Sequence, residues 1–536
     1  MDRDRRVRIY DAHSWTGIAL GLFLFMVCFT GSVALFDHEL VSWEDPARRL
    51  AIAENPVPVQ SLFEEWVAEY PPEKVTFLSI TYPSVYEPYY LGRINYQPEE
   101  GAPIEFLQRR WSTHDGSILP EREDGLATWL LGIHRDLMWP DFLGGRTIGR
   151  GLVGIAGVIM LLSIVTGILT HRKILKEVFT YRTKKSVRVK WKDAHNFLGI
   201  WSLPFSITIA FTGAWLGIVA LLLPVTAMLV FKGDTEQVVE LLVGADPDRA
   251  GISAPMLSLD DVAQRPHSES GALPVTVFAF NWGDENAIYT VNYKPENKLT
   301  YYDVERINGV TGEMLPLAGI LEPAASTRTI AAVSPLHYGT YGGIALKYLY
   351  FGLGIAMSLM VALGNMVWIE RRAHSAEGSR SPQFYDRLAR LTAGVCAGLA
   401  LASVAVFYVD AAYVGAEDAR IFWVGLTYFA TWFAATLYAF FPSNAYRASR
   451  SLIQFTGIGL LGLPVVSAVV GGEAPWTAYL RGHVAAPAVD LTLLVLGLIC
   501  LLVATRLPIE RLEAKARKRQ TAAVALATDA FAEKAA

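Results

Sequence analysis

The sequence predicts a polytopic α-helical membrane protein with about eight transmembrane helices, and with two small α+β domains inserted between spans one and two and between spans three and four. Three observations predict this class. Apolar residues make up 52% of the 536-residue chain, the mean hydropathy is +0.30, and uncharged stretches of membrane length recur along the sequence. Such a composition is typical of chains whose apolar surface faces lipid.

Eight apolar stretches reach the ~18 residues that a helix needs to cross a hydrocarbon core. They comprise residues 18–36, 151–170, 197–231, 344–369, 391–409, 421–441, 452–470 and 489–507. The first stretch lacks a small-residue cleavage pattern, so we expect a retained span and not a cleaved signal peptide. The last four have little polar content, which is typical of a structural or partner-binding bundle.

The spans divide the chain into segments of different character. They are the N-terminus with span one (1–36), the first outside domain (37–147), spans two and three with a basic link (148–231), the second outside domain (232–343), span four (344–369), the C-terminal four-helix region (391–507) and a tail (508–536). Each outside domain contains three strand-like stretches before a turn, at 75–82, 89–96 and 106–111 in the first and at 275–280, 287–293 and 300–307 in the second.

Positive charge is concentrated on alternate connections. The link 172–192 holds nine Lys or Arg, the connection 371–390 holds five, and further clusters occupy the first eight residues and residues 506–519. Because Lys and Arg are enriched in cytoplasmic loops, we expect both termini in the cytoplasm and both outside domains across the membrane. The net charge of −4 indicates no partner by itself, and we expect no nucleic-acid partner.

A heptapeptide that opens the first span returns 182 residues later at the third. Asp11–Gly17 (DAHSWTG) is matched by Asp193–Gly199 (DAHNFLG), and Thr-Gly pairs follow at equal distances, Thr30-Gly31 and Thr212-Gly213. The N-terminal ~370 residues are therefore expected to be a tandem duplication of span, outside domain and span, related by an axis along the membrane normal.

The second span of each half is preceded by a histidine. His134 comes before a span that contains Thr166-Gly167, and His337 comes before a span that contains Gly364. The register is looser here than at the heptapeptide, but the order of elements is the same. This match extends the duplication to both spans of each half.

Histidines thus gather at two levels of the predicted membrane, where an ionisable side chain is costly without a partner. His13, His195 and His171 lie at the cytoplasmic level, and His134 and His337 lie at the outer level. Zinc or copper normally takes three or four ligands, whereas a haem iron needs only two axial imidazoles. We predict two b-type haems, the first with His13 and His195 as iron ligands and the second with His134 and His337.

Small and aromatic neighbours would suit a porphyrin. The glycines four residues after the two inner histidines, Gly17 and Gly199, place a flat helix face beside each ring. Trp15 and Phe197 occupy matching positions and could form walls of a slot. All four residues are therefore expected near the inner haem.

The cytoplasmic level has three histidines, one more than a single haem iron needs. The third is His171, whose matching residue in the second half is Trp368. Three roles stay open for His171: it could replace His13 or His195 as an axial ligand, serve a third site, or contact a haem propionate. The remaining histidines are expected to be ordinary interfacial side chains; they are His38, His114, His267, His374 and His483.

With these motifs assembled, the chain resembles the PepSY-associated transmembrane proteins, also called iron-regulated membrane proteins. The resemblance covers about residues 8–372 and rests on the two His-x-aromatic-x-Gly helix starts, the Thr-Gly pairs, and the segments 131–135 (LGIHR) and 334–339 (SPLHYG). It implies a bacterial inner-membrane protein with PepSY domains in the periplasm. Some members of the family are di-haem ferric-siderophore reductases. The last four spans lie outside the resemblance.

The leading hypothesis is transmembrane electron transfer by b-type haems that ends in reduction of a ferric siderophore or another ferric chelate for iron acquisition. No G-x-G-x-x-G fingerprint follows a predicted strand, so we expect a separate electron donor, either a quinol or a redox protein. Two alternatives stay open: a PepSY-domain sensor or peptidase regulator, and a transporter-associated membrane protein without redox activity.

Overall fold

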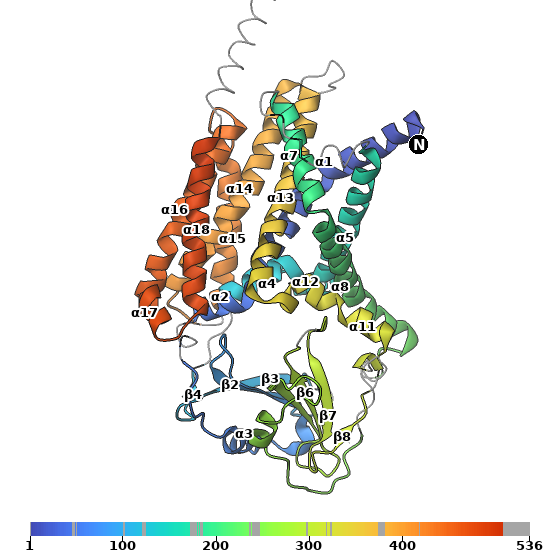
Figure 1. Cartoon of the computed structure of the whole chain (residues 1–536), viewed down its shortest axis with the longest axis vertical. Coiled ribbons are helices and arrows are strands. Elements are labelled where there is room, and N and C mark those ends of the chain that lie inside the picture. Colours follow the sequence, from blue (N-terminus) through green and yellow to red (C-terminus); the bar gives the residue numbers. More distant parts are fainter. Residues whose placement is uncertain are drawn as a thin grey trace, which may run out of the picture.

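The computed structural model describes eight helices long and apolar enough to cross a membrane (Figure 1), which confirms the predicted fold class. They are α1 (Arg3–Ala34), α5 (Gly145–Thr170), α8 (Leu203–Val230), α13 (Gly343–Ala373), α14 (Pro382–Ala412), α15 (Arg420–Tyr438), α16 (Ala445–Val470) and α18 (Ala485–Arg506).

The residues that the structure describes are 2–45, 49, 51–99, 102–120, 125–171, 179–180, 182, 186–234, 237, 247–295, 298–317, 319–321, 324–373, 381–416 and 419–507. Most of the first part of the basic link 172–192, His374 and the tail 508–536 lie outside these ranges.

The third span differs from the first in being broken. It consists of α7 (Val187–Trp201) and α8, with Ser202 between them. Pro204 lies in the first turn of α8, where the missing N–H of proline is tolerated but cannot continue the hydrogen-bond ladder of α7. The matching residue of the first half is Leu22, and α1 runs unbroken. The two helices that carry the inner histidines are therefore not equivalent.

The two outside segments form one antiparallel sheet. Its strands are β1 (Val75–Thr81), β2 (Tyr89–Tyr96), β3 (Glu105–Ser112), β4 (Ile118–Leu119), β5 (Pro274–Phe280), β6 (Ile288–Tyr293), β7 (Asp303–Asn308) and β8 (Met314–Leu315). The order is β4-β3-β2-β1-β5-β6-β7-β8. Each segment supplies four consecutive strands, but the expected pair of separate domains is joined edge to edge. An unjoined β1 or β5 would leave an open edge of backbone donors and acceptors.

The junction between the halves is a regular ladder. Thr81 pairs with Thr276, and their hydroxyl oxygens lie 3.1 Å apart. The helices α3 (Val59–Val67) and α10 (Leu259–Ala263) pack with the sheet in one apolar core. Their N-termini are capped across the junction, because Asp260 accepts from the backbone N–H of Val59 at 2.8 Å and Gln60 accepts from that of Leu259 at 2.6 Å. Each half thus completes hydrogen bonds of the other.

Three short helices lie between the sheet and the membrane helices (Figure 1): α2 (Asp37–Glu44), α4 (Leu126–Arg135) and α12 (Val333–Tyr338). We call this end of the membrane helices the sheet side and the opposite end the far side. The short helices α4 and α12 carry His134 and His337.

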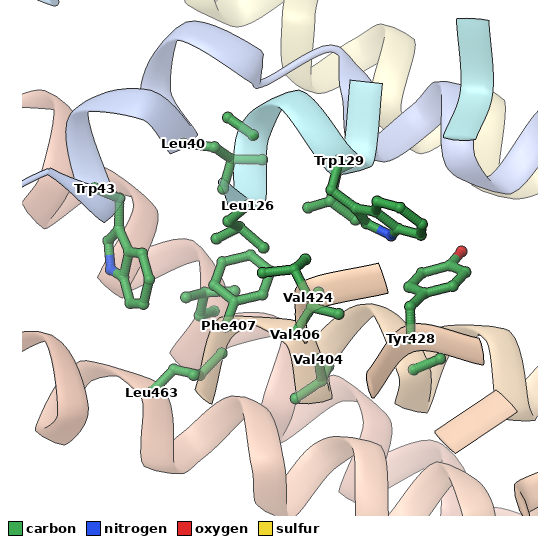
Figure 2. Packing of buried hydrophobic residues seen from close by; sticks show 14 of the residues in the cluster. Leu40, Trp43, Leu126, Trp129, Val404, Val406, Phe407, Val424, Tyr428 and Leu463 are labelled. Carbon is green, nitrogen blue, oxygen red and sulfur yellow. The ribbon is translucent and has the colours of Figure 1, made fainter. Parts of the chain in front are cut away.

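The C-terminal helices pack around α2 and α4 of the first half (Figure 2). Trp43 of α2 lies against Phe407, with 5.1 Å between ring centres, and donates from Nε1 to Asp490 Oδ1 at 2.8 Å. Trp129 of α4 lies against Tyr428, with 5.9 Å between ring centres. Both indoles are almost fully buried. The C-terminal helices therefore hold two surface helices of the duplicated region.

A cysteine pair at the junction would test the joined sheet. We expect T81C/T276C to form a disulfide on mild oxidation in intact membranes, because the two side chains face each other across one antiparallel pair. Mass spectrometry of the cross-linked peptide measures it. The control T81C/T290C places the second cysteine on β6, one strand further away, and should not cross-link. A sheet divided between β1 and β5 would give no disulfide in either variant.

Candidate functional site

Four of the predicted site histidines form two pairs at opposite ends of the membrane helices. On the far side, the ring centres of His13 and His195 lie 6.4 Å apart with an interplanar angle of 66°. On the sheet side, those of His134 and His337 lie 6.2 Å apart with an angle of 16°. The structure thus brings together the two pairs that the repeat predicts.

Each of the four rings is held through Nδ1 by a membrane helix of its own half. The acceptors are Ser163 O for His13 at 3.0 Å, Met360 O for His195 at 2.8 Å, Val27 O for His134 at 3.0 Å and Thr212 Oγ1 for His337 at 2.9 Å. The Thr212 hydroxyl donates to Thr208 O at 2.7 Å, so it accepts from His337. Nδ1 therefore carries the proton in all four rings, and Nε2 keeps its lone pair.

A glycine makes room for each of these rings. A Cβ atom would lie 2.6 Å from Cε1 of His134 at Gly31, 3.0 Å from Cε1 of His337 at Gly213, 3.3 Å from Cε1 of His13 at Gly167 and 3.2 Å from Cε1 of His195 at Gly364. The glycine follows the accepting carbonyl by four residues in three of the sites, so one bare turn of helix accommodates the ring and accepts its hydrogen bond. The sequence shows these glycines as part of the repeat, but it does not predict this role.

Burial keeps the sheet-side imidazoles neutral. Both lie on short helices outside the eight spans. Loss of solvent lowers the pKa of His134 to about 4. The same loss, together with the neighbouring His134, lowers the pKa of His337 to about 3. A neutral imidazole with an available Nε2 is the form that binds a metal.

The spacing of the pairs fits a metal held between two imidazoles. Two metal–nitrogen bonds of ~2 Å, extended by the radius of each ring, separate the ring centres by ~6 Å. The second nitrogen of each ring is bound to a carbonyl or hydroxyl, as is usual for histidine ligands. Within the described residues no three His, Cys, Asp or Glu side chains form a metal-binding group. Two imidazoles are the donor set that haem iron needs from a protein.

A cavity of about 400 Å³ surrounds the sheet-side pair. This volume is in the range of cofactor and small-molecule sites. Equivalent residues of the two halves line this cavity: Gly157 is matched by Gly354, and Met160 by Met357. The two members of each pair are 197 residues apart, the separation of Gly167 and Gly364. The cavity therefore lies on the axis that relates the two halves.

Four charged side chains also line this cavity: Asp37, Arg135, Arg150 and Lys347. Arg135 forms an ion pair of 2.9 Å with the neighbouring Asp136. Lys347 lies 2.9 Å from each carboxylate oxygen of Glu39. Sequence reasoning missed these residues, because a single charged side chain near the start of a helix carries no local signal that it lines a cavity.

The other predicted site residues lie on the far side. His171 is the C-cap of α5 and interacts electrostatically with His195. Gly17 faces open space, with no atom within 4 Å of an added Cβ, whereas a Cβ at Gly199 would lie 3.0 Å from Met360 Sδ. The space beside Gly17 is therefore open, whereas the space beside Gly199 is filled by the side chain of Met360.

The aromatic neighbours are not arranged alike. Trp15 lies against Trp368, with 5.6 Å between ring centres, and both rings are contacted by Arg372. Phe197 lies against Trp201, with 5.9 Å between ring centres.

Three histidines that were expected to be ordinary have local partners. His114 contacts Ala51 O, His267 lies 3.7 Å from Glu305, and His38 stacks on Tyr86. His38 also lines the sheet-side cavity, which the sequence does not indicate.

The C-terminal bundle fixes the start of the helix that carries His134. Asp410 accepts from the backbone N–H of Leu126 at 3.1 Å, and its second oxygen lies 2.6 Å from the guanidinium of Arg420. Glu44 accepts from the N–H of Ala127 at 3.1 Å. These carboxylates satisfy two N–H groups of the first turn and oppose the positive end of the helix dipole. Gly125 permits the contact, because a Cβ there would lie 2.4 Å from Asp410 Oδ1.

The chain matches known proteins over the duplicated region. A family model described as "PepSY-associated TM region" matches residues 10–371, as the motifs predict. An uncharacterized protein of Pseudomonas aeruginosa is 28% identical over 381 residues, which cover 69% of this chain and 91% of the relative. The helices α14, α15, α16 and α18 lie beyond the family match.

Asp410→Asn should loosen the helix α4. The variant removes the carboxylate charge that lies 2.6 Å from the buried Arg420, and breaking such a buried pair costs ~3–5 kcal/mol. We expect faster hydrogen exchange in residues 126–135 than in the wild type, measured by mass spectrometry on the full-length protein.

Thr392→Ala is the matched control for this variant. It removes a buried polar group of the same helix that bonds only its own backbone. The double variant D410L/R420M removes both buried charges, so it should recover thermal stability while α4 stays poorly protected. Wild-type protection of α4 in D410N would contradict the anchoring role.

Proposed function

Because the chain belongs to the PepSY-associated TM family, we propose that it is a membrane electron-transfer protein with two b-type haems. His134 and His337 would hold the sheet-side haem, and His13 and His195 would hold the far-side haem. One observation carries the proposal: four half-buried imidazoles form two pairs, and each ring is fixed through Nδ1, so that Nε2 is available to bind a metal.

The chain's part in this function is to hold the ligands still. A haem bound between the two imidazoles of a pair would supply one-electron chemistry. The Nδ1–H hydrogen bonds fix the orientation of each ring and raise the electron density at Nε2. Apolar residues such as Leu24, Met160 and Met357 line the cavity around the sheet-side pair, and this environment together with the two imidazoles would set the reduction potential.

The two sites would form a path across the membrane. Helix α1 supplies His13 near its start on the far side and, near its end, the Val27 carbonyl and Gly31 that seat His134 on the sheet side. A single rigid helix therefore contributes to both sites. We propose that the far side faces the cytoplasm, as the basic connections indicate, and that a quinol or a redox protein donates electrons there.

The proposed acceptor is a ferric chelate on the sheet side. Transfer of one electron converts Fe(III) to Fe(II), no bond of the chelator is broken, and the ferrous ion is held far less tightly by siderophore-type ligands. The helices α4 and α12, which carry the sheet-side pair, lie between the membrane helices and the outside sheet (Figure 1), so an external chelate would approach the pair from the sheet side. The support for this substrate is the family resemblance and the position of the pair.

The absorbance of the purified full-length protein tests the proposal. We expect b-haem bands in the reduced-minus-oxidised spectrum and two haems per chain by pyridine haemochrome. His13→Ala and His134→Ala should each remove about half of the haem. His114→Ala, which changes a histidine of the sheet region bound to Ala51 O, should remove none. Absence of b-haem bands from the wild-type protein would contradict the proposal and would favour a sensor or transporter function.

A glycine substitution tests the seat of one ring. Gly31→Ala brings a methyl group to 2.6 Å from the His134 ring, an overlap that typically costs ~1–3 kcal/mol. We expect a changed spectrum and lower retention for the sheet-side haem only. Gly352→Ala adds the same methyl to another membrane helix where nothing lies within 4 Å, and it should behave as the wild type. Equal spectra in both variants would show that the glycine seat is not needed.

A further inference from the structure

Two cations occupy equivalent places beside the sheet-side histidines. Arg150 on α5 and Lys347 on α13 are 197 residues apart, the separation of the glycines Gly167 and Gly364 that seat the far-side rings. Both line the cavity that contains His134. The duplication therefore places one positive charge on each side of the cavity.

Only one of these two charges is neutralised within the described residues. Glu39 binds Lys347 through both oxygens at 2.9 Å and also accepts from Tyr86 at 3.2 Å. The residue of the second half that matches Glu39 is Leu221, and Leu221 packs close to Gly151, next to Arg150. A leucine cannot take the place of the carboxylate. Both halves therefore place a cation beside the cavity, but a leucine stands where the carboxylate matching Glu39 would neutralise Arg150.

Arg150 accordingly has a buried Nε without a hydrogen-bond partner, and no ion pair within the described part of the chain. The charges of Arg135 and Asp37, which also line the cavity, are compensated within the chain. Arg135 is paired with Asp136, and Asp37 lies in the first turn of α2, where the helix dipole stabilises its charge. A guanidinium at a membrane helix is costly unless an anion compensates it.

We infer that Arg150 binds a carboxylate group inside this cavity. A guanidinium presents its donors as a planar fork that matches the two oxygens of a carboxylate. Two sources have this chemistry: a propionate of the haem, which rests on the proposed function, and a carboxylate of the ferric chelate that approaches from the sheet side. Lys347 does not compete for the group because Glu39 already holds it.

Arg150→Gln removes the charge and keeps a polar side chain of similar shape. Arg146→Gln is the matched control, since Arg146 is an exposed arginine about one turn earlier on the same helix. In the first arm, full-length protein produced without haem is titrated with haem and with haem dimethyl ester, whose propionates carry no charge. If the carboxylate belongs to the haem, R150Q weakens haem binding about tenfold or more and leaves binding of the ester unchanged.

In the second arm, ferric citrate is titrated against the same variants by calorimetry, both with and without haem. If the carboxylate belongs to the chelate, R150Q raises the Kd for ferric citrate about tenfold or more and haem binding is unaltered. Glu39→Gln releases Lys347 and should tighten carboxylate binding in whichever arm responds.

The inference is overturned if R150Q matches R146Q in both arms. The same titrations distinguish failure of this inference from failure of the proposed function. A wild-type protein that binds no haem, but binds ferric citrate in an Arg150-dependent way, would retire the haem proposal and keep the carboxylate site. A protein that binds both haems but does not respond to R150Q would do the reverse.

Discussion

Both histidine sites depend on one kind of contact. In this contact an imidazole approaches a membrane helix so closely that its Nδ1 reaches an acceptor on that helix. Backbone carbonyls of a helix are normally shielded by side chains, so the contact requires a glycine at the point of approach. Gly31, Gly213, Gly167 and Gly364 meet this requirement. Close packing of the helices around each ring then follows, because the ring occupies space that a side chain would fill.

Much of this arrangement could be predicted from the sequence, because it is repeated. The spans, the strand-like stretches and the histidine pairs all follow from patterns that occur twice. What was missed involves contacts between the repeats or beyond them. The joining of β1 to β5 depends on the geometry of two edges, and the seat of His134 on Gly31 depends on helix packing. Residues such as Arg150 carry no local signal, since one arginine at a helix start is common on sequence grounds alone.

The two halves have equivalent elements, but the contacts that hold these elements differ between the halves. The carboxylates Glu44 and Asp410 hold the helix of His134, whereas the helix of His337 is held by the Tyr350 hydroxyl, which donates to Leu336 O at 3.1 Å. The break before α8 occurs in the second half alone, and Lys347 has a carboxylate partner in Glu39, whereas the residue that matches Glu39 near Arg150 is Leu221. His134 and His337, which are equivalent in sequence, are therefore held in place by different contacts.

The reciprocal caps between α3 and α10 bear on the order of events during synthesis. Val59 and Leu259 each depend on a partner from the other half, so the first outside segment cannot complete its hydrogen bonds while the ribosome is still making the second. At ~5–20 residues per second the wait between them lasts ~10–40 s. During that interval the edge of β1 that later pairs with β5 keeps unpaired backbone donors and acceptors, which is the kind of strand edge that a chaperone protects.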